Sequence, residues 1–154
     1  MAIEAPLSKY KRSGFVIYIA VCIAAALWLG YDGYISKGFI AEHTDEQGTP
    51  DSTLVFNQKA PPFFLAAAVL LAGYFYAIRN RKLVAEDEAL IIAGKKKIPY
   101  DSIEKIDKTY FETKGFFTIT YTDENGASVQ RKVSDRQYDN LGPILDHLVA
   151  QISS

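Results

Sequence analysis

Residues 61–82, PPFFLAAAVLLAGYFYAIRNRK, decide how this chain is organised. The apolar part of the stretch carries no charge, and three basic residues, Arg79, Arg81 and Lys82, then close it. An apolar run that ends in basic residues is typical of a membrane-spanning helix whose C-terminal end lies in the cytoplasm. We therefore expect residues 60–79 to form a transmembrane helix.

A second apolar run precedes it at residues 13–31, SGFVIYIAVCIAAALWLGY. As a helix this run is about 28 Å long, close to the thickness of a bilayer's hydrocarbon core. Trp28, Tyr31 and Tyr34 lie at its far end, where aromatic side chains anchor a span at the membrane interface. A cleaved signal peptide is the competing interpretation, because such a peptide also consists of a basic segment followed by an apolar stretch.

The charges outside these runs predict an orientation. Residues 32–59 connect the two spans and have a net charge of about −3, whereas basic residues flank the spans on their other sides. This asymmetry favours an extracytoplasmic connector, with residues 1–12 as a cytoplasmic leader and residues 82–154 as a cytoplasmic domain. The predicted location is a bacterial cytoplasmic (inner) membrane, crossed twice, with both ends inside.

Small residues recur four apart in both runs, for example Ala26 with Gly30, Ala68 with Ala72, and Gly73 with Ala77. Such rows let membrane helices approach each other closely. They predict either packing of the two spans on each other or contacts with another copy or another protein.

The polar domain has the pattern of short antiparallel strands. Apolar and polar residues alternate from 117 to 122, Asn125-Gly126 suits a hairpin turn, and Pro99 restricts its segment to a sheet edge. The expected strands are residues 83–85, 89–93, 97–100, part of 103–110, 117–122 and 127–133.

An amphipathic helix ends the domain. Apolar residues recur at helical spacing, and Asp139 is the expected N-cap. The apolar positions are Leu141, Ile144, Leu145, Leu148, Val149 and Ile152. The predicted fold class is a membrane α-hairpin of two transmembrane helices plus an α+β domain.

Three segments carry a family resemblance: LVAEDEALIIAG at 83–94, KKKIPYDSIEKID at 95–107, and YDNLGPILDHLVAQI at 138–152. Together with the membrane hairpin, they resemble the bacterial pleckstrin-homology-like (bPH-type) domain membrane proteins. The resemblance implies an antiparallel, partly open barrel of about seven strands, capped by the last helix. It implies no shared catalytic residues.

A basic set is the main candidate binding site. Lysines near a membrane attract anionic headgroups, by about 1 kcal/mol for each basic residue. The candidates for lipid-headgroup contact are Arg79, Arg81, Lys82, Lys95, Lys96 and Lys97. The acidic run at 86–88 is close in sequence and favours the alternative, a solvated basic turn.

Other chemistry finds little support. The net charge of −1 gives no pull toward nucleic acid, and the single cysteine, Cys22, excludes a disulfide within the chain. His43 and His147 are not arranged for a metal site or for catalysis, and no phosphate-binding loop or nucleophile elbow occurs. We expect no enzyme activity, cofactor or metal.

The predicted function is that of a membrane-anchored interaction or scaffold protein. Its partners would be the lipid bilayer and a protein, or a second copy bound through the spans or the domain. The alternatives are an accessory subunit of a larger membrane transporter or enzyme complex and, third, an anionic-lipid sensor.

Overall fold

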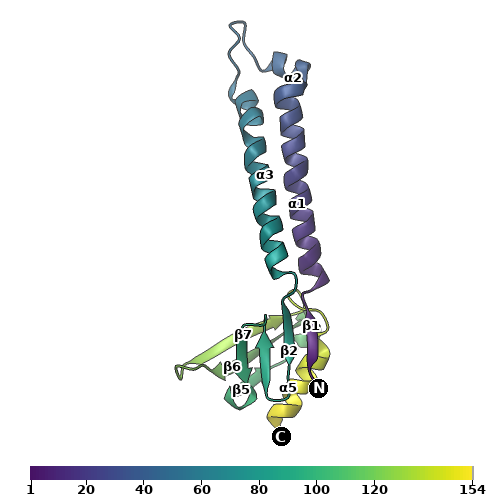
Figure 1. The fold of residues 1–154 in the computed structure, drawn as a ribbon, viewed down its shortest axis with the longest axis vertical. Coiled ribbons are helices and arrows are strands. Elements are labelled where there is room, and N and C mark those ends of the chain that lie inside the picture. Colours follow the sequence, from purple (N-terminus) through teal and green to yellow (C-terminus); the bar gives the residue numbers. More distant parts are fainter. Residues whose placement is uncertain (154) are drawn as a thin grey trace. The chain divides into compact units, whose positions relative to one another are not determined.

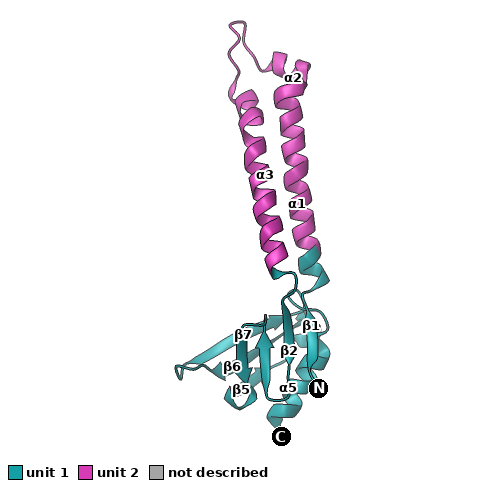
Figure 2. Ribbon diagram, in the orientation of Figure 1, with its two compact units in different colours: residues 1–12, 78–154 teal, residues 13–77 magenta. Residues whose placement is uncertain are grey.

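The computed structural model describes residues 1–153 and divides the chain into two compact units (Figures 1 and 2). Unit 2 is residues 13–77. Unit 1 is discontinuous: it combines residues 1–12 with residues 78–154. The chain therefore leaves unit 1 after residue 12 and returns to it at residue 78.

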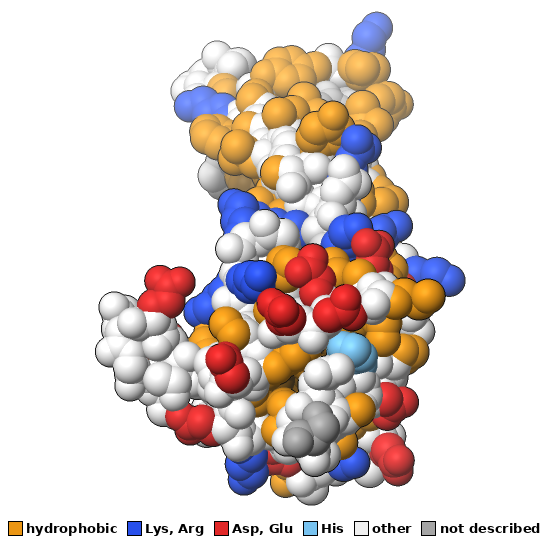
Figure 3. All heavy atoms as spheres, turned by 60° about the horizontal axis from the view of Figure 1, so that its bottom comes forward, with side chains coloured by type: hydrophobic (Ala, Val, Ile, Leu, Met, Phe, Trp, Pro, Cys, Tyr) orange, Lys and Arg blue, Asp and Glu red, His pale blue; other side chains and the backbone are white. Residues whose placement is uncertain are grey.

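Unit 2 contains most of a helical hairpin. Helix α1 (Lys9–Gly30) continues as a short π-helix, η1 (Tyr31–Ile35), and α2 (Lys37–Glu42) precedes α3 (Ser52–Ile78). Two stretches, Lys9–Ile35 and Ser52–Ile78, are by length and composition long and apolar enough to cross a membrane. Figure 3 shows mainly hydrophobic side chains on the outside of these helices.

Helix α3 begins earlier than the sequence suggested. Asp51 accepts a hydrogen bond from the Leu54 N–H through its carboxylate (2.8 Å), which starts the helix at Ser52. The expected start at residue 60 was wrong: it would place Pro61 and Pro62 in the first helical turn, where proline is tolerated, but both lie inside α3. Much of the expected connector is therefore helical.

A proline inside a helix leaves the carbonyl four residues earlier without its usual donor. For Pro62 that carbonyl belongs to Gln58, and the Tyr34 hydroxyl donates to it at 2.8 Å. The Gln58 side chain in turn donates to the Gly33 carbonyl at 3.0 Å. The chain thus supplies from η1 the hydrogen bond that Pro62 removes from α3.

The two long helices pack on each other through some of the small residues. Ala26 and Ala68 are buried, and Gly30 lies close to the Pro61 ring. Gly73, in contrast, has open space where a Cβ would lie, and Ala72 and Ala77 are exposed. The prediction that small residues pack within the hairpin is therefore confirmed for Ala26, Gly30 and Ala68 only.

Unit 1 contains two antiparallel sheets, with the strand orders β1-β2-β3-β4 and β5-β6-β7. The strands of the first sheet are β1 (Ile3–Pro6), β2 (Lys82–Ala85), β3 (Ala89–Ile92) and β4 (Lys96–Pro99). Those of the second are β5 (Ile103–Asp107), β6 (Phe116–Thr122) and β7 (Ser128–Ser134). The 3-10 helix η2 (Tyr100–Ser102) and the short α4 (Phe111–Lys114) complete the connections.

Strand β1 was not expected from the sequence. It pairs with β2 in an antiparallel register that runs from Ile3 opposite Ala85 to Pro6 opposite Lys82. The leader at residues 1–12 is therefore part of the domain, and the hairpin is an insertion between two hydrogen-bonded neighbouring strands.

Helix α5 (Leu141–Ser153) packs its predicted apolar face against the sheets. Leu141, Ile144, Leu145 and Leu148 are buried in one core with residues of both sheets, such as Leu90. The expectation that Asp139 caps this helix was wrong. Its carboxylate accepts instead from the N–H of Lys9, the first residue of α1, at 3.0 Å.

Candidate functional site

The basic residues predicted to contact lipid lie mainly at one end of the first sheet. Lys82 begins β2, and the Ala93 N–H donates to its carbonyl at 2.9 Å, which places the β3–β4 turn beside it. Lys95 and Lys96 belong to that turn and to the start of β4. The structure therefore brings Lys82, Lys95 and Lys96 to the end of the sheet at which β1 finishes. We call it the basic end.

The acidic run at 86–88 lies at the other end of the same strands, in the β2–β3 turn. The four residues of β2 separate the two ends by about 13 Å. The run therefore does not neutralise the basic end directly, although it is close in sequence. Acidic side chains are spread over the face of the domain in view in Figure 3.

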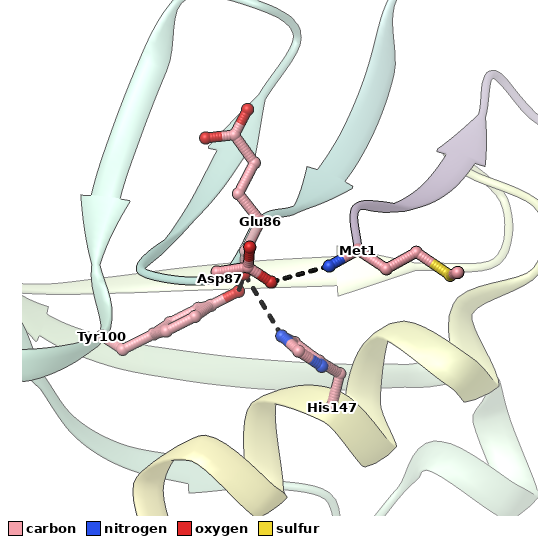
Figure 4. A network of polar contacts seen from close by, with 5 residues as sticks. All are labelled: Met1, Glu86, Asp87, Tyr100 and His147. Carbon is pink, nitrogen blue, oxygen red and sulfur yellow. Dashed lines mark hydrogen bonds and ion pairs between the residues drawn. The ribbon is translucent and has the colours of Figure 1, made fainter.

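The acidic turn is held to the rest of the domain by a polar cluster (Figure 4). The Tyr100 hydroxyl donates to the Glu86 carbonyl at 2.6 Å, and Nε2 of His147 on α5 lies 3.2 Å from the same oxygen. The Met1 ammonium pairs with Asp87 at 2.8 Å, and this contact lowers the pKa of the Asp87 carboxyl. Burial, with Asp87 and Glu86 nearby, raises the pKa of Tyr100 to about 12. The contact of His147 with the Glu86 carbonyl therefore has a structural role: it joins α5 to the acidic turn.

Two of the predicted lysines already have partners. Lys82 forms an ion pair with Glu4 of β1 at 2.5 Å, and the Lys96 ammonium lies 5.1 Å from the centre of the Tyr121 ring. Both side chains are therefore less available to a lipid than the sequence suggested. Arg79, just after α3, is exposed.

An open groove of about 590 Å³ runs beside β4. Lys95, Lys96 and Lys97 line it together with Asp123 and Glu124 of the β6–β7 turn. The lysine run therefore faces carboxylates across the groove, which weakens its attraction for an anionic surface. β4 is an edge strand, as Pro99 predicted.

A second, smaller pocket collects basic residues that are far apart in sequence. It has a volume of about 150 Å³ and lies within unit 1. Its lining residues are Leu7, Lys11, Ile78, Arg81, Ala93, Arg131, Gln137 and Tyr138. Of its three cations only Arg81 was predicted as a site residue.

Arg131 had a signal in the sequence. Val129, Arg131 and Val133 occupy one face of β7, and the partner of Arg131 across the ladder is the fully buried Ile119. An arginine between two valines on the inward face of a strand breaks the alternation, and this break could have singled it out. Nothing in the sequence around Lys11 marked it as a site residue. The other two cations of the pocket, Arg81 and Arg131, come after the helical hairpin in sequence, so their proximity to Lys11 could not be foreseen.

The predicted interface anchors are exposed on the hairpin. Trp28, Tyr31 and Tyr34 all present most of their surface to the outside. The Trp28 indole N–H donates to Asp32 at 2.8 Å, and Tyr34 has the additional role at Gln58 described above. Sequence reasoning missed a second exposed pair, Tyr74 and Tyr76, near the other end of α3.

The connector holds a histidine–carboxylate pair. Nδ1 of His43 lies 2.6 Å from Asp51, whose pKa is lowered by the Leu54 N–H and by His43. Within residues 1–153, no three side chains of the metal-binding types come together.

Comparison of the chain with protein-family models, with curated proteins and with solved structures gave no match.

Proposed function

We propose that this chain is a non-enzymatic, membrane-anchored interaction protein that presents a pleckstrin-homology-like domain at the cytoplasmic face of a bacterial inner membrane. The observation that carries the proposal is the pairing of β1 with β2 on either side of the helical hairpin. An interaction module joined to its anchor by two chain crossings cannot diffuse away from the membrane.

The pairing also supports the proposed topology. Residues Ile3–Pro6 precede the first apolar helix, and Lys82–Ala85 follow the second. Hydrogen-bonded strands lie on the same side of a membrane, so the hairpin between them crosses it an even number of times. The basic residues at both crossings favour the cytoplasm as that side.

The sheet organisation supports the pleckstrin-homology-like part of the proposal. Antiparallel sheets of four and three strands are followed by one C-terminal helix packed on their core. The resemblance of residues 82–152 implies about seven antiparallel strands capped by a last helix; six strands lie within these residues, and β1 (Ile3–Pro6) supplies a seventh. The resemblance carries no activity with it, because a fold does not determine a function.

The groove beside β4 is the surface we propose for a protein partner. It combines an unpaired strand edge with lysines on one wall and carboxylates on the other. An extended peptide can add to such an edge through main-chain hydrogen bonds, with its side chains selected by the flanking charges.

Photocrosslinking in native membranes tests this assignment. A photoreactive residue at Lys97, in the groove, is expected to crosslink one protein in stoichiometric yield. The matched control is Ala150, an exposed position of α5 outside the groove. Equal crosslinking from both positions, or none from Lys97, would contradict the groove as the partner site.

An accessory subunit is the second candidate, and the outward small residues of α3 favour it. Gly73 has open space around it, and Ala72 and Ala77 are exposed. A crosslinker at Leu70, exposed on the same helix, would then capture a membrane protein while Lys97 captures nothing.

Cysteine labelling tests the topology. In a Cys22→Ala background, a cysteine at Ser52 should react with an impermeant reagent in intact cells, and a cysteine at Ser128 should not. Labelling of Ser128 from outside would overturn the orientation.

A further inference from the structure

We propose that the small pocket lined by Lys11, Arg81 and Arg131 binds the phosphate group of an anionic phospholipid. This site is distinct from the lysine run at 95–97 and goes beyond the protein-binding function proposed above. The proposal that the ligand is a lipid rests on the membrane location proposed above. The proposal that the pocket binds a phosphate group rests on the pocket alone.

The three cations come from three separate elements. Lys11 lies in the first turns of α1, Arg81 just before β2, and Arg131 on β7. No acidic residue lines the pocket, and none of the three forms an ion pair with a carboxylate of residues 1–153. Like charges gathered without a counter-charge repel each other, and a bound anion removes that repulsion.

Arg131 strengthens the case because of where it lies on its strand. Arg131 lies on the face of β7 that carries Val133 and pairs with Ile119, although its side chain is exposed. A charge on that face of an edge strand can serve to prevent edge-to-edge aggregation. That role accounts for Arg131 by itself. It does not account for Lys11 and Arg81, which reach the same pocket from elements outside that sheet.

The pocket also offers neutral donors. Tyr138 and Gln137 line it, and neither side chain makes a hydrogen bond within the described chain. Burial raises the pKa of Tyr138 even though Arg131 and Arg81 oppose the rise, so its hydroxyl keeps its proton at neutral pH. Guanidinium groups with an added hydroxyl donor suit the oxygens of a phosphate.

Size and position select the ligand. A volume of about 150 Å³ holds a phosphate group but is smaller than the roughly 300 Å³ at which sites for drug-sized ligands begin. Lys11 directly precedes residue 12 and Arg81 lies three residues after residue 78, and at these two points the chain passes between unit 1 and the apolar helices. If those helices span a bilayer, the nearest phosphates are those of lipid headgroups.

The test is calorimetric titration of the full chain in a neutral maltoside detergent with short-chain phosphatidylglycerol. We expect saturable binding that Arg131→Gln and Arg81→Gln each weaken by about tenfold or more. The matched control, Lys95→Gln with Lys96→Gln and Lys97→Gln, removes three cations from the groove and should leave the affinity unchanged. Arg131 is exposed, so its variant is expected to fold, and circular dichroism checks that it does.

Three results would overturn the proposal. Unchanged affinity in the Arg131→Gln and Arg81→Gln variants, or loss of binding in the triple-lysine control, would remove the pocket as the site. Inorganic phosphate that binds as tightly as phosphatidylglycerol would remove the lipid as the ligand. The cysteine labelling described above tests the membrane location separately, so a wrong location can be distinguished from a wrong binding site.

Discussion

Two buried tyrosines of the domain differ in what their hydroxyls contact. Tyr100 donates to the Glu86 carbonyl at 2.6 Å, whereas the Tyr121 hydroxyl has no hydrogen-bond partner within residues 1–153. A buried polar group costs free energy unless it is hydrogen-bonded. The same substitution should therefore have opposite effects at the two positions.

We predict that Tyr100→Phe lowers the free energy of unfolding of the domain by about 1 kcal/mol, and that Tyr121→Phe raises it by up to about 1 kcal/mol. The measurement is urea unfolding of the full chain in detergent, followed by tyrosine near-ultraviolet circular dichroism. Each variant is the control for the other, because both remove one hydroxyl from a buried ring. Destabilisation by Tyr121→Phe equal to that by Tyr100→Phe would contradict the contrast.

Tyr100 also predicts a dependence on alkaline pH. Its pKa is raised to about 12 in the folded chain from the ordinary value of 10.0. Between these values the folded state keeps a proton that the unfolded state loses, so this contribution to stability is complete below pH 10 and falls as the pH rises toward 12. The difference in unfolding free energy between the wild type and Tyr100→Phe should shrink over this range. A constant difference from pH 9 to 11.5 would show that the pKa is not raised.

At the residue scale, the sequence indicated which side chains would be important, but not which groups they would contact. Tyr34 was predicted as an interface anchor, and its side chain is exposed. Its hydrogen bond to Gln58 was not foreseeable, because the need for it arises only once Pro62 lies inside a helix. Similarly, Asp139 looked like the cap of the helix that follows it and instead caps α1, 130 positions away in sequence.

At the scale of elements, the closest approach in the hairpin depends on one glycine. A Cβ at Gly33 would lie 2.8 Å from the Asn57 carbonyl oxygen, which is backbone and cannot move aside as a side chain can. The same atom at Gly73 would meet nothing within 4 Å.

We predict that Gly33→Ala destabilises the hairpin by about 1–3 kcal/mol, because α3 must shift to make room. Gly73→Ala should be neutral or slightly stabilising, since alanine is the better helix former. Unfolding by sodium dodecyl sulfate in mixed micelles measures both, with Trp28, the only tryptophan, as a fluorescent reporter inside the hairpin. Equal stability of the two variants would argue against the close contact at Gly33.

Most elements of the domain were predictable because their partners are near in sequence. The β6–β7 hairpin, the edge position of β4 and the apolar face of α5 follow from alternation, a proline and helical spacing. Strand β1 was not predictable. It is four residues long, and its partner β2 follows only after the whole helical hairpin.

At the scale of the whole molecule, the β1–β2 pairing makes the N-terminal residues, which were expected to form a leader, part of the domain. They are an edge strand of the domain, so a fragment that starts at residue 82 lacks part of its own sheet. Ala5 of β1 is fully buried in the same core as Leu83 and Leu148. The first sheet is therefore complete only after both apolar helices have been made, and binding studies need the full chain.

The most direct test of this central claim is a disulfide between β1 and β2. In a Cys22→Ala background, cysteines replace Pro6 and Lys82, which are exposed and directly opposite in the ladder. Opposed residues of antiparallel strands have Cα atoms about 4.5–5.5 Å apart, within the range of a disulfide. The control pairs a cysteine at Pro6 with one at Lys105, on the other sheet. We predict that mild oxidation of isolated membranes links residues 6 and 82 and leaves 6 and 105 unlinked, as read by mass spectrometry of the joined peptides. No link between 6 and 82, or equal linking of both pairs, would contradict a domain built from both sides of the hairpin.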